Sequence, residues 1–201
     1  MQSPYSPIPG AGPPTRGLFV DRWGTLLVKP QGIVETFEQV EFVPGAIDAL
    51  FHASQAHWNI YLIGNEEDVA FGRLPLESWK AIESGMLEHL RAHGVPVKRM
   101  YACTDHPEGQ KPHNQDSVFL LPNTGALYHA AQMDGVELRE SWVIGDGTLE
   151  LAAGWRAGCR IARVETGQPL GEGELQVEPD LVEPDLPRLL KQLGAHEGVR
   201  F

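Results

Sequence analysis

The sequence predicts an α/β fold in which a central parallel sheet carries helices on both faces. Short apolar runs of strand length alternate along the chain with longer segments whose apolar residues recur at helical spacing. This alternation favours a parallel sheet, because each crossover helix covers one face before the next strand begins. Two of the apolar runs end in a carboxylate, at Asp21 and at Asp146. Ligands of such sheets bind beyond the carboxyl ends of the strands, so these two residues mark the expected site.

Five short apolar runs are the expected strands. In chain order they are residues 18–20, 59–63, 99–103, 142–144 and 159–164. The first run, Leu-Phe-Val, stops at Asp21, and the fourth, Trp-Val-Ile, stops at Gly145 and Asp146. A carboxylate directly after a buried run lies at the edge of the sheet, where its side chain can meet a ligand.

Five segments with helical spacing are the expected helices. In chain order they are residues 44–57, 76–93, 123–133, 149–157 and 185–193. Pro44 suits the first turn of the first helix, because proline lacks the amide hydrogen that a first turn leaves unpaired. Trp79, Ile82 and Met86 lie on one face of the second helix, and Gly94 is its stop signal.

The length of 201 residues suits one domain. We expect this domain at residues 17–195, after a disordered Pro/Gly-rich leader at residues 1–16 and before a C-terminal tail at residues 196–201. The two cysteines lie far apart in the sequence, which argues against a disulfide framework and favours a reducing compartment. No apolar run approaches the ~18 residues of a membrane span, so we expect a cytoplasmic protein without membrane contact.

The chain is acidic, with a formal net charge of −11 and a pI near 5.1. Binding of nucleic acid needs a basic face that neutralises phosphates, so nucleic acid is not an expected partner. A small phosphorylated metabolite remains an expected partner, because a lysine and a metal ion can reverse the field inside one cleft. The sequence leaves the oligomeric state open.

A second acidic segment, residues 142–150, reads Trp-Val-Ile-Gly-Asp-Gly-Thr-Leu-Glu. It ends a strand in Asp146 and places Glu150 four residues later, at the start of a helix. Aspartate after a strand is common as a turn or capping residue, so this segment alone is weak evidence for a site. Together with Asp21 at the end of another strand, it favours a functional interpretation.

The two segments resemble the first and last motifs of the haloacid dehalogenase (HAD) superfamily of phosphotransferases. Residues 21–25 are similar to Asp-x-Asp-Gly-Thr, and residues 145–150 are similar to Gly-Asp-x-x-x-Asp. Further collinear segments resemble the capless branch typified by histidinol-phosphatase and D-glycero-D-manno-heptose-bisphosphate phosphatase. They are residues 41–50, 64–72, 103–107 and 110–112. The resemblance implies a three-layer Rossmann-like HAD fold, α/β with a central parallel sheet and no large cap domain.

The same resemblance implies a mechanism of phosphomonoester hydrolysis. Asp21 is the expected nucleophile, which forms an aspartyl phosphate. Asp21, Asp146 and Glu150 are the expected ligands of Mg²⁺, although the family usually has Asp where Glu150 stands. Oxygen ligands suit Mg²⁺, which takes one or two carboxylates together with water and substrate phosphate. Lys111 is expected to screen the phosphate and the intermediate during catalysis.

Two departures from the family pattern fall in the expected substrate site, which comprises Asn65, Gly64 and Trp23. Gly64 stands where the family has a Thr or Ser that hydrogen-bonds the phosphoryl group. Trp23 stands where the family has the Asp that protonates the leaving alcohol and then activates water. Trp23 does neither, because the indole N–H does not titrate in this range. Its bulk also projects toward the place where a leaving group must sit.

The missing acid has three candidate substitutes on neighbouring loops, namely Glu66, Asp105 and His106. General acid–base help contributes ~10²–10⁴-fold to such reactions, so a chain without a substitute would be slow.

Zinc is not an expected cofactor. A structural Zn²⁺ needs four Cys or His ligands. The loop that begins at Cys103 contains His106 and His113 but no second cysteine before Lys111.

The sequence leaves three functions open. The preferred prediction is a Mg²⁺-dependent phosphomonoester hydrolase that is slow or altered because of Trp23. The second is a non-catalytic relative that binds a phosphorylated ligand or a protein partner, which the loss of the acid favours. The third is a metal-independent dehalogenase-like hydrolase, because residues 21–26 are also similar to the Asp-x-Tyr-Gly-Thr-Leu of 2-haloacid dehalogenases. Asp146 and the missing cap region speak against the third.

Overall fold

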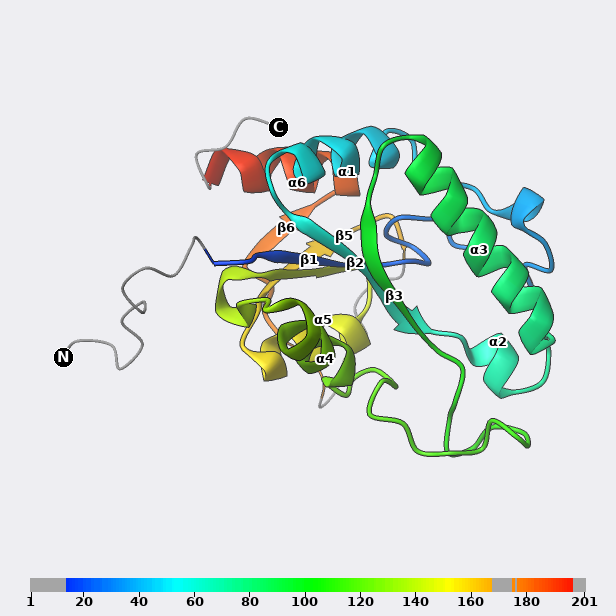
Figure 1. Cartoon of the computed structure of the whole chain (residues 1–201). Helices are drawn as coiled ribbons and strands as arrows, with labels where there is room; N and C mark the ends of the chain where they lie inside the picture. The colour runs from blue at the N-terminus through cyan, green and yellow to red at the C-terminus, as the bar shows by residue number, and fades with distance from the viewer. Residues whose placement is uncertain (1–13, 168–174, 176, 197–201) are drawn as a thin grey trace.

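A six-stranded parallel sheet forms the centre of the molecule (Figure 1). The computed structural model describes residues 14–167, 175 and 177–196. The strands are β1 (Gly17–Asp21), β2 (Asn59–Asn65), β3 (Val97–Cys103), β4 (Trp142–Gly145), β5 (Arg160–Val164) and β6 (Leu181–Glu183). Their order across the sheet is β3-β2-β1-β4-β5-β6, and all neighbouring pairs are parallel. β1 therefore lies inside the sheet, with β2 on one side and β4 on the other.

Helices cover both faces of the sheet, as Figure 1 shows. On one face lie α1 (Ala46–Gln55), α3 (Leu76–Ala92) and α6 (Leu186–His196). On the other face lie α4 (Gly125–Asp134) and α5 (Thr148–Ala157). A single turn, α2 (Glu67–Ala70), follows β2, and two 3-10 turns occupy Phe37–Gln39 and Leu138–Glu140. The predicted three-layer α/β fold is confirmed.

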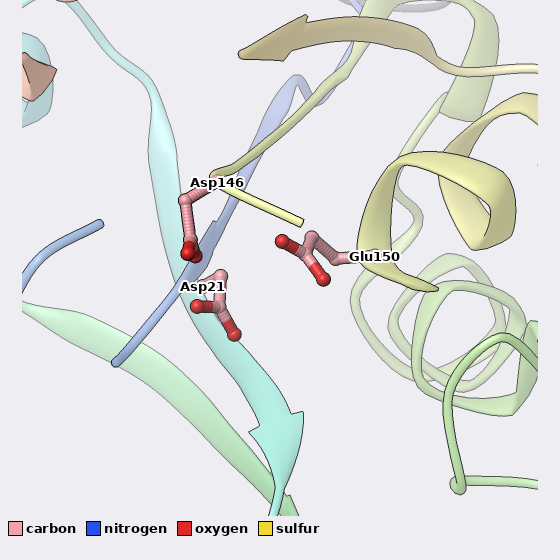
Figure 2. Close-up of side chains that lie close together, drawn as sticks. All are labelled: Asp21, Asp146 and Glu150. Carbon is pink, nitrogen blue, oxygen red and sulfur yellow. The ribbon is translucent and has the colours of Figure 1, made fainter. Parts of the chain in front are cut away.

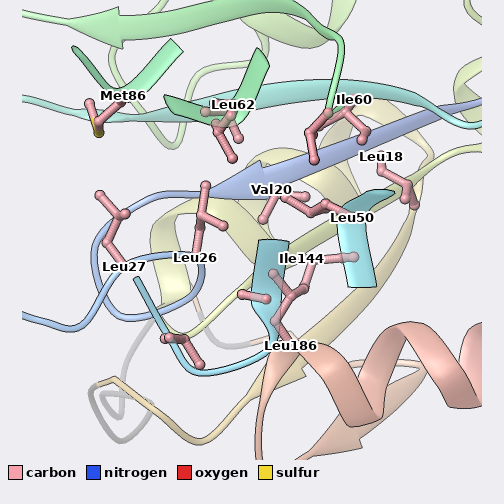
Figure 3. Packing of buried hydrophobic residues seen from close by; sticks show 14 of the residues in the cluster. Leu18, Val20, Leu26, Leu27, Leu50, Ile60, Leu62, Met86, Ile144 and Leu186 are labelled. Carbon is pink, nitrogen blue, oxygen red and sulfur yellow. The ribbon is translucent and has the colours of Figure 1, made fainter. Parts of the chain in front are cut away.

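Each face of the sheet has its own apolar core, because successive side chains of a strand point to opposite faces. Leu18 and Val20 of β1 pack in the cluster that contains Leu50 of α1 and Leu186 of α6 (Figure 3). Phe19, between them, packs in the cluster on the α4 and α5 side. Burial of one such side chain contributes about 1.5–3 kcal/mol. β1 is therefore anchored from both faces up to its last residue.

Two elements and several boundaries differ from the sequence prediction. β6 and α2 were not predicted, because three and four residues are too short for a periodic pattern to emerge. α1 begins at Ala46 rather than at residue 44, because Gly45 takes the left-handed conformation with φ 78° and ends the preceding loop. β2 continues beyond Ile63 to Asn65.

Thr15 and Arg16, at the end of the expected leader, contact the domain. Thr15 forms a β-bridge with Val136, and the guanidinium carbon of Arg16 lies 4.1 Å from the centre of the Trp58 ring. Residues 1–13 of the expected leader and residues 197–201 of the expected tail lie outside the described residues.

The connections between the described strands and helices carry no inserted domain. The longest, residues 22–45 between β1 and α1, folds back on itself through bridges of Leu27 with Trp23 and with Phe42. The predicted absence of a large cap agrees with this course of the chain. None of the described helices has the length and apolar character that a membrane crossing requires.

Replacement of Leu62 by alanine in β2 should lower the free energy of unfolding by about 2–5 kcal/mol, because a fully buried leucine leaves a cavity. Urea denaturation followed by circular dichroism measures the change. Val182→Ala in the edge strand β6, where the side chain is 47% exposed, is the matched control and should change stability by less than about 0.5 kcal/mol. Equal losses for the two variants would contradict the description of the core.

Candidate active site

Three carboxylates meet at the carboxyl edge of the sheet (Figure 2). Asp21 is the last residue of β1, Asp146 directly follows β4, and Glu150 lies in the first turn of α5. One oxygen from each side chain lies within 4.8 Å of the other two. The adjacency of β1 and β4 in the sheet brings Asp21 and Asp146 together, although they lie far apart in the sequence. At the other end of these strands, Gly17 donates its backbone N–H to the Ser141 hydroxyl across a separation of 124 residues. The structure thus places the three predicted metal ligands in one cluster.

Small residues and hydrogen bonds hold the Asp146 and Glu150 carboxylates in place. Thr25 donates its hydroxyl to Asp146 Oδ1 at 3.4 Å, and the backbone N–H of Gly147 donates to Glu150 Oε1. Gly24 has φ 98°, and a Cβ there would lie 2.5 Å from Asp146 Oδ2. The Gly-Thr turn after β1 therefore supports the Asp146 carboxylate across the sheet.

The cluster is strongly acidic and almost withdrawn from solvent. Burial raises the pKa of Asp21 well above its ordinary value, and repulsion by Glu150 and Asp146 raises it further. Arg22 opposes this shift. Burial and Asp146 likewise raise the pKa of Glu150. Three buried carboxylates so close together fit a hard divalent cation, because an oxygen-only set of this kind suits Mg²⁺ and the ion would relieve the repulsion.

The cluster opens into a cavity of about 710 Å³. Its walls come from the loops after β1 and β2, from the start of α5 and from the loop before α4. The described lining residues are Asp21, Trp23, residues 29–34, residues 65–68, Arg73, Leu74, Trp79, Leu121 and residues 146–150. A cavity of this size is within the ~300–1,000 Å³ of small-molecule sites.

Trp23 lines this cavity and is fixed by Glu66. The indole Nε1–H donates to Glu66 Oε1 at 3.2 Å. The same oxygen forms an ion pair with Arg22, whose Nη1 lies 2.7 Å away. The geometry of this contact does not meet the criteria for a hydrogen bond. Burial raises the pKa of Glu66, while Arg22 and Trp23 act in the opposite direction. Glu66 therefore joins the two residues that follow the expected nucleophile.

Arg22 is fully buried, and its guanidinium is held on several sides. Nε donates to the carbonyl oxygen of Ile63 at 3.2 Å and Nη2 to that of Asn65 at 3.5 Å. The guanidinium carbon also lies 4.8 Å from the centre of the Trp79 ring, which favours a cation–π interaction. A buried arginine needs such partners, because an unpaired buried charge is strongly destabilising.

Gly64 makes room for this arginine. A Cβ at position 64 would lie 2.8 Å from Arg22 Nη2 and 3.0 Å from Asp21 Oδ1. The backbone there has φ 147°, which side chains rarely adopt. Gly64 itself is not among the described residues that line the cavity. The absence of a Thr or Ser at this position is thus coupled to the buried Arg22.

The structure brings Asn65 to the cavity but does not bring Lys111 there. The side-chain amide of Asn65 binds the backbone of the loop before α4. Its Nδ2 donates to Leu121 O at 3.2 Å, and its Oδ1 accepts from Leu121 N at 2.9 Å. Lys111 is exposed and is not among the described lining residues. Leu121 is the residue of its loop that lines the cavity. The geometry therefore gives no support to the predicted role of Lys111.

Of the three candidate substitutes for the acid, Glu66 alone is among the described lining residues. Asp105 Oδ1 lies 3.2 Å from His113 Nδ1, and His106 Nδ1 accepts from the backbone N–H of Glu108. Cys103 donates its thiol to the carbonyl oxygen of Asp105. These residues form a separate loop network beyond β3.

Sequence reasoning missed three cations near the site. Lys29 and Arg73 line the cavity, and Arg73 pairs with Asp68 at 2.6 Å. Lys29 belongs to the loop after the first motif, and no spacing pattern marked it. Arg22 is adjacent to Asp21 in sequence, but its buried contacts depend on residues that lie 41 and 43 positions away.

No protein-family model matches the chain. A protein of Mesorhizobium japonicum named D-glycero-beta-D-manno-heptose-1,7-bisphosphate 7-phosphatase is 31% identical to it over 163 residues, which cover 81% of this chain and 72% of the relative. This chain belongs to the HAD-like phosphatase family. A protein of Haemophilus influenzae with the same name is 29% identical over 182 residues and supports membership of this family, with 89% of this chain and 98% of the relative covered.

Solved structures of the HAD-like family have the same fold. The D,D-heptose 1.7-bisphosphate phosphatase from B. bronchiseptica, complexed with magnesium and phosphate, has a TM-score of 0.75 and 24% identity. It is matched over 99% of its length and 90% of this chain. A putative HAD-like phosphatase from Mesorhizobium loti has a TM-score of 0.74 and 26% identity, covering 90% of this chain and 88% of the other. The predicted superfamily and its hydrolase class are confirmed.

Gly64→Ala should lower the free energy of unfolding by about 1–3 kcal/mol, because the new methyl group meets Arg22 and Asp21 in a strained backbone conformation. Gly32→Ala is the matched control, since a Cβ there meets nothing within 4 Å. Thermal and urea denaturation of both variants measure the difference. A Gly64→Ala protein as stable as the control would contradict the close packing around Arg22.

The metal-free protein should lose stability as the pH rises above about 4, where the Asp and Glu carboxyls of the unfolded chain ionise. The raised pKa values of Asp21 and Glu150 mean that the folded state keeps its protons to higher pH than the unfolded state does. This contribution to stability is present at low pH and is lost as the pH rises through the folded-state pKa values.

Asp21→Asn should flatten this decline and stabilise the metal-free protein at neutral pH. Asp48→Asn on the exposed surface of α1 is the control and should keep the wild-type slope. Urea denaturation in EDTA between pH 4 and pH 8 measures the slopes. A steeper decline in Asp21→Asn would refute the repulsion described for the cluster.

Proposed function

We propose that this chain is a Mg²⁺-dependent phosphomonoester hydrolase that acts through an aspartyl phosphate on Asp21. The observation that carries the proposal is the cluster of Asp21, Asp146 and Glu150, whose ligand oxygens lie within 4.8 Å of one another in the lining of a cavity. Oxygen ligands alone are the set that Mg²⁺ prefers. The named activity of the family members gives the reaction class.

In the proposed reaction a carboxylate oxygen of Asp21 attacks phosphorus, and the bond from phosphorus to the leaving oxygen breaks. Water then attacks the phosphorus of the aspartyl phosphate, which releases phosphate and regenerates the carboxylate. A bound Mg²⁺ would neutralise the phosphoryl oxygens and the carboxylates that hold it. Asp146 and Glu150 orient the site, and Thr25 fixes Asp146 through its hydroxyl.

Trp23 makes the proposed hydrolase slow or altered toward ordinary alcohol esters. Its indole cannot protonate a leaving alkoxide. Loss of a general acid typically costs ~10²–10⁴ in rate. The side chain of Asn65 is committed to Leu121, and Lys111 is exposed, so neither is arranged to restore this loss.

The proposed substrate is a small phosphorylated metabolite. The relatives are named for a phosphorylated sugar, and the cavity of about 710 Å³ suits a molecule of that size. A cytoplasmic location remains part of the proposal. It is consistent with Cys103 and Cys159, which are free thiols in the structure.

A non-catalytic role is the second candidate function. The observation that favours it is Trp23, which stands in the cavity in place of a titratable group and is held there by Glu66. In that role the carboxylate cluster and cavity would bind a phosphorylated ligand or a protein partner without turnover.

Phosphate release from a panel of sugar, amino-alcohol and nucleotide phosphomonoesters should require Mg²⁺ and vanish in EDTA. Asp21→Asn should reduce turnover at least ~10³-fold, because the nucleophile is lost. Glu88→Gln, an exposed carboxylate change on α3, is the matched control and should retain wild-type turnover. Release of phosphate is measured directly under steady-state conditions.

Turnover that survives Asp21→Asn would refute the role of the nucleophile. Folded wild-type protein that releases no phosphate, but is stabilised by a phosphomonoester in thermal denaturation, would favour the non-catalytic role instead.

A further inference from the structure

Trp23 forms a fixed aromatic wall beside Asp21. Its backbone is held by a β-bridge to Leu27, and its Nε1–H donates to Glu66 Oε1. Only one residue separates it from Asp21 in sequence, and both line the same cavity. The fixed ring and the attacking carboxylate therefore line the same cavity, in which a bound ester must lie.

Other apolar side chains continue this wall. Ile33 and Val34 contribute from the loop after β1, Leu74 and Trp79 from the segment before and in α3, and Leu121 from the loop before α4. Leu74, Trp79, Leu121 and Val34 are buried, so their surfaces are firmly placed. An apolar group that enters here gains about 25 cal/mol for each Å² of apolar surface removed from water.

Several of the polar groups around the wall are already engaged with one another. The Asn65 amide is bonded on both sides to the backbone of Leu121. Asp68 is paired with Arg73, and the Oε1 atom of Glu66 is shared by Arg22 and Trp23. A leaving group with many hydroxyls would lose hydrogen bonds to water without finding free partners in these residues, which is unfavourable.

The chemistry of the leaving oxygen points in the same direction. An alkoxide is about as basic as hydroxide, whose conjugate acid has a pKa of ~15.7, and it needs a proton as it departs. A phenolate corresponds to a pKa of ~10 and departs without one. Trp23 supplies no proton, and the Oε1 atom of Glu66 is already engaged by Arg22 and by Trp23 itself.

We infer that the site hydrolyses aryl phosphomonoesters, with the aromatic ring of the ester packed against Trp23 and the apolar wall. This inference rests on the proposed phosphatase function and names its substrate class. An Asp21 oxygen bonds to phosphorus, the bond from phosphorus to the aryl oxygen breaks, and the electron pair leaves with the phenolate. The phenolate takes a proton from water. A second water then attacks phosphorus, the bond to Asp21 breaks, and phosphate is released.

Matched esters separate ring packing from leaving-group basicity. 2-Phenylethyl phosphate and glucose 6-phosphate both release a primary alcohol, so their ratio of kcat/KM compares an aromatic ring with a hydroxylated one at similar basicity of the leaving oxygen. Comparison of phenyl phosphate with its nitro-substituted derivatives shows how strongly the rate depends on protonation of the leaving oxygen. We expect phenyl phosphate to exceed glucose 6-phosphate by ~10² or more, which is the scale of a missing general acid. We also expect 2-phenylethyl phosphate to exceed glucose 6-phosphate by about tenfold.

Variants of Trp23 make the test specific to this residue. Trp23→Ala should lower kcat/KM for phenyl phosphate about tenfold, whereas Trp23→Phe, which retains a ring, should lower it less. Trp23→Asp should raise turnover of glucose 6-phosphate and lower that of phenyl phosphate, because a proton donor replaces the aromatic surface. This reversal of preference is not expected from a change in stability alone.

Binding provides a readout that does not depend on turnover. With Mg²⁺ present, phenylphosphonate should raise the Tm of the wild-type protein more than methylphosphonate does. The difference should disappear in Trp23→Ala. The two phosphonates have the same head group, so the comparison isolates the ring.

The outcomes distinguish this inference from the proposed function. Faster turnover of glucose 6-phosphate than of 2-phenylethyl and phenyl phosphate would overturn the aryl preference and leave the phosphatase intact. Failure to release phosphate from any ester would overturn the phosphatase, and equal Tm shifts for the two phosphonates would then overturn the aryl preference as well.

Discussion

The parallel backbone pairing of β1 with β2 and β4 brings residues from distant parts of the chain to one edge of the sheet. β1 delivers Asp21, β4 delivers Asp146, and the end of β2 delivers Asn65 and Glu66. Parallel strands end on the same side, so all three groups face one cavity. Because the apolar side chains of β1 are packed from both faces, this edge is held by two cores rather than one.

The same edge of the sheet carries two separate groups of charged residues. The buried carboxylates of Asp21, Asp146 and Glu150 repel one another, which suits a divalent cation. On the other side of Asp21, Arg22 is committed to Glu66. The lining of the cavity therefore combines a carboxylate cluster with a separate group of apolar side chains, and this contrast is the physical basis for the proposed chemistry and for the inferred class of leaving group.

The sequence was sufficient to predict the fold and the carboxylate cluster, because both depend on local signals. Asp21 and Asp146 each end an apolar run, and Glu150 follows in the first turn of a helix. Arg22 and Glu66 could not be paired from sequence, because their contact depends on how the end of β2 passes the turn after β1. Lys111 belongs to a short motif in a long loop, and a motif of that length does not determine where the loop runs. The loop meets the cavity at Leu121 instead.

Gly64 and Arg22 also constrain how this site could change over generations. A side chain at position 64 meets the Arg22 guanidinium, so a hydroxyl could not be regained there by one substitution without displacing a buried charge. Replacing Arg22 first would leave the buried Glu66 carboxylate without its ion-pair partner, with the indole N–H of Trp23 as its remaining donor among the described contacts. We expect substitutions at these four positions to have non-additive effects on stability, because the residues share one set of contacts. The usual phosphatase pattern is therefore reached from this chain by changing several positions together rather than one at a time.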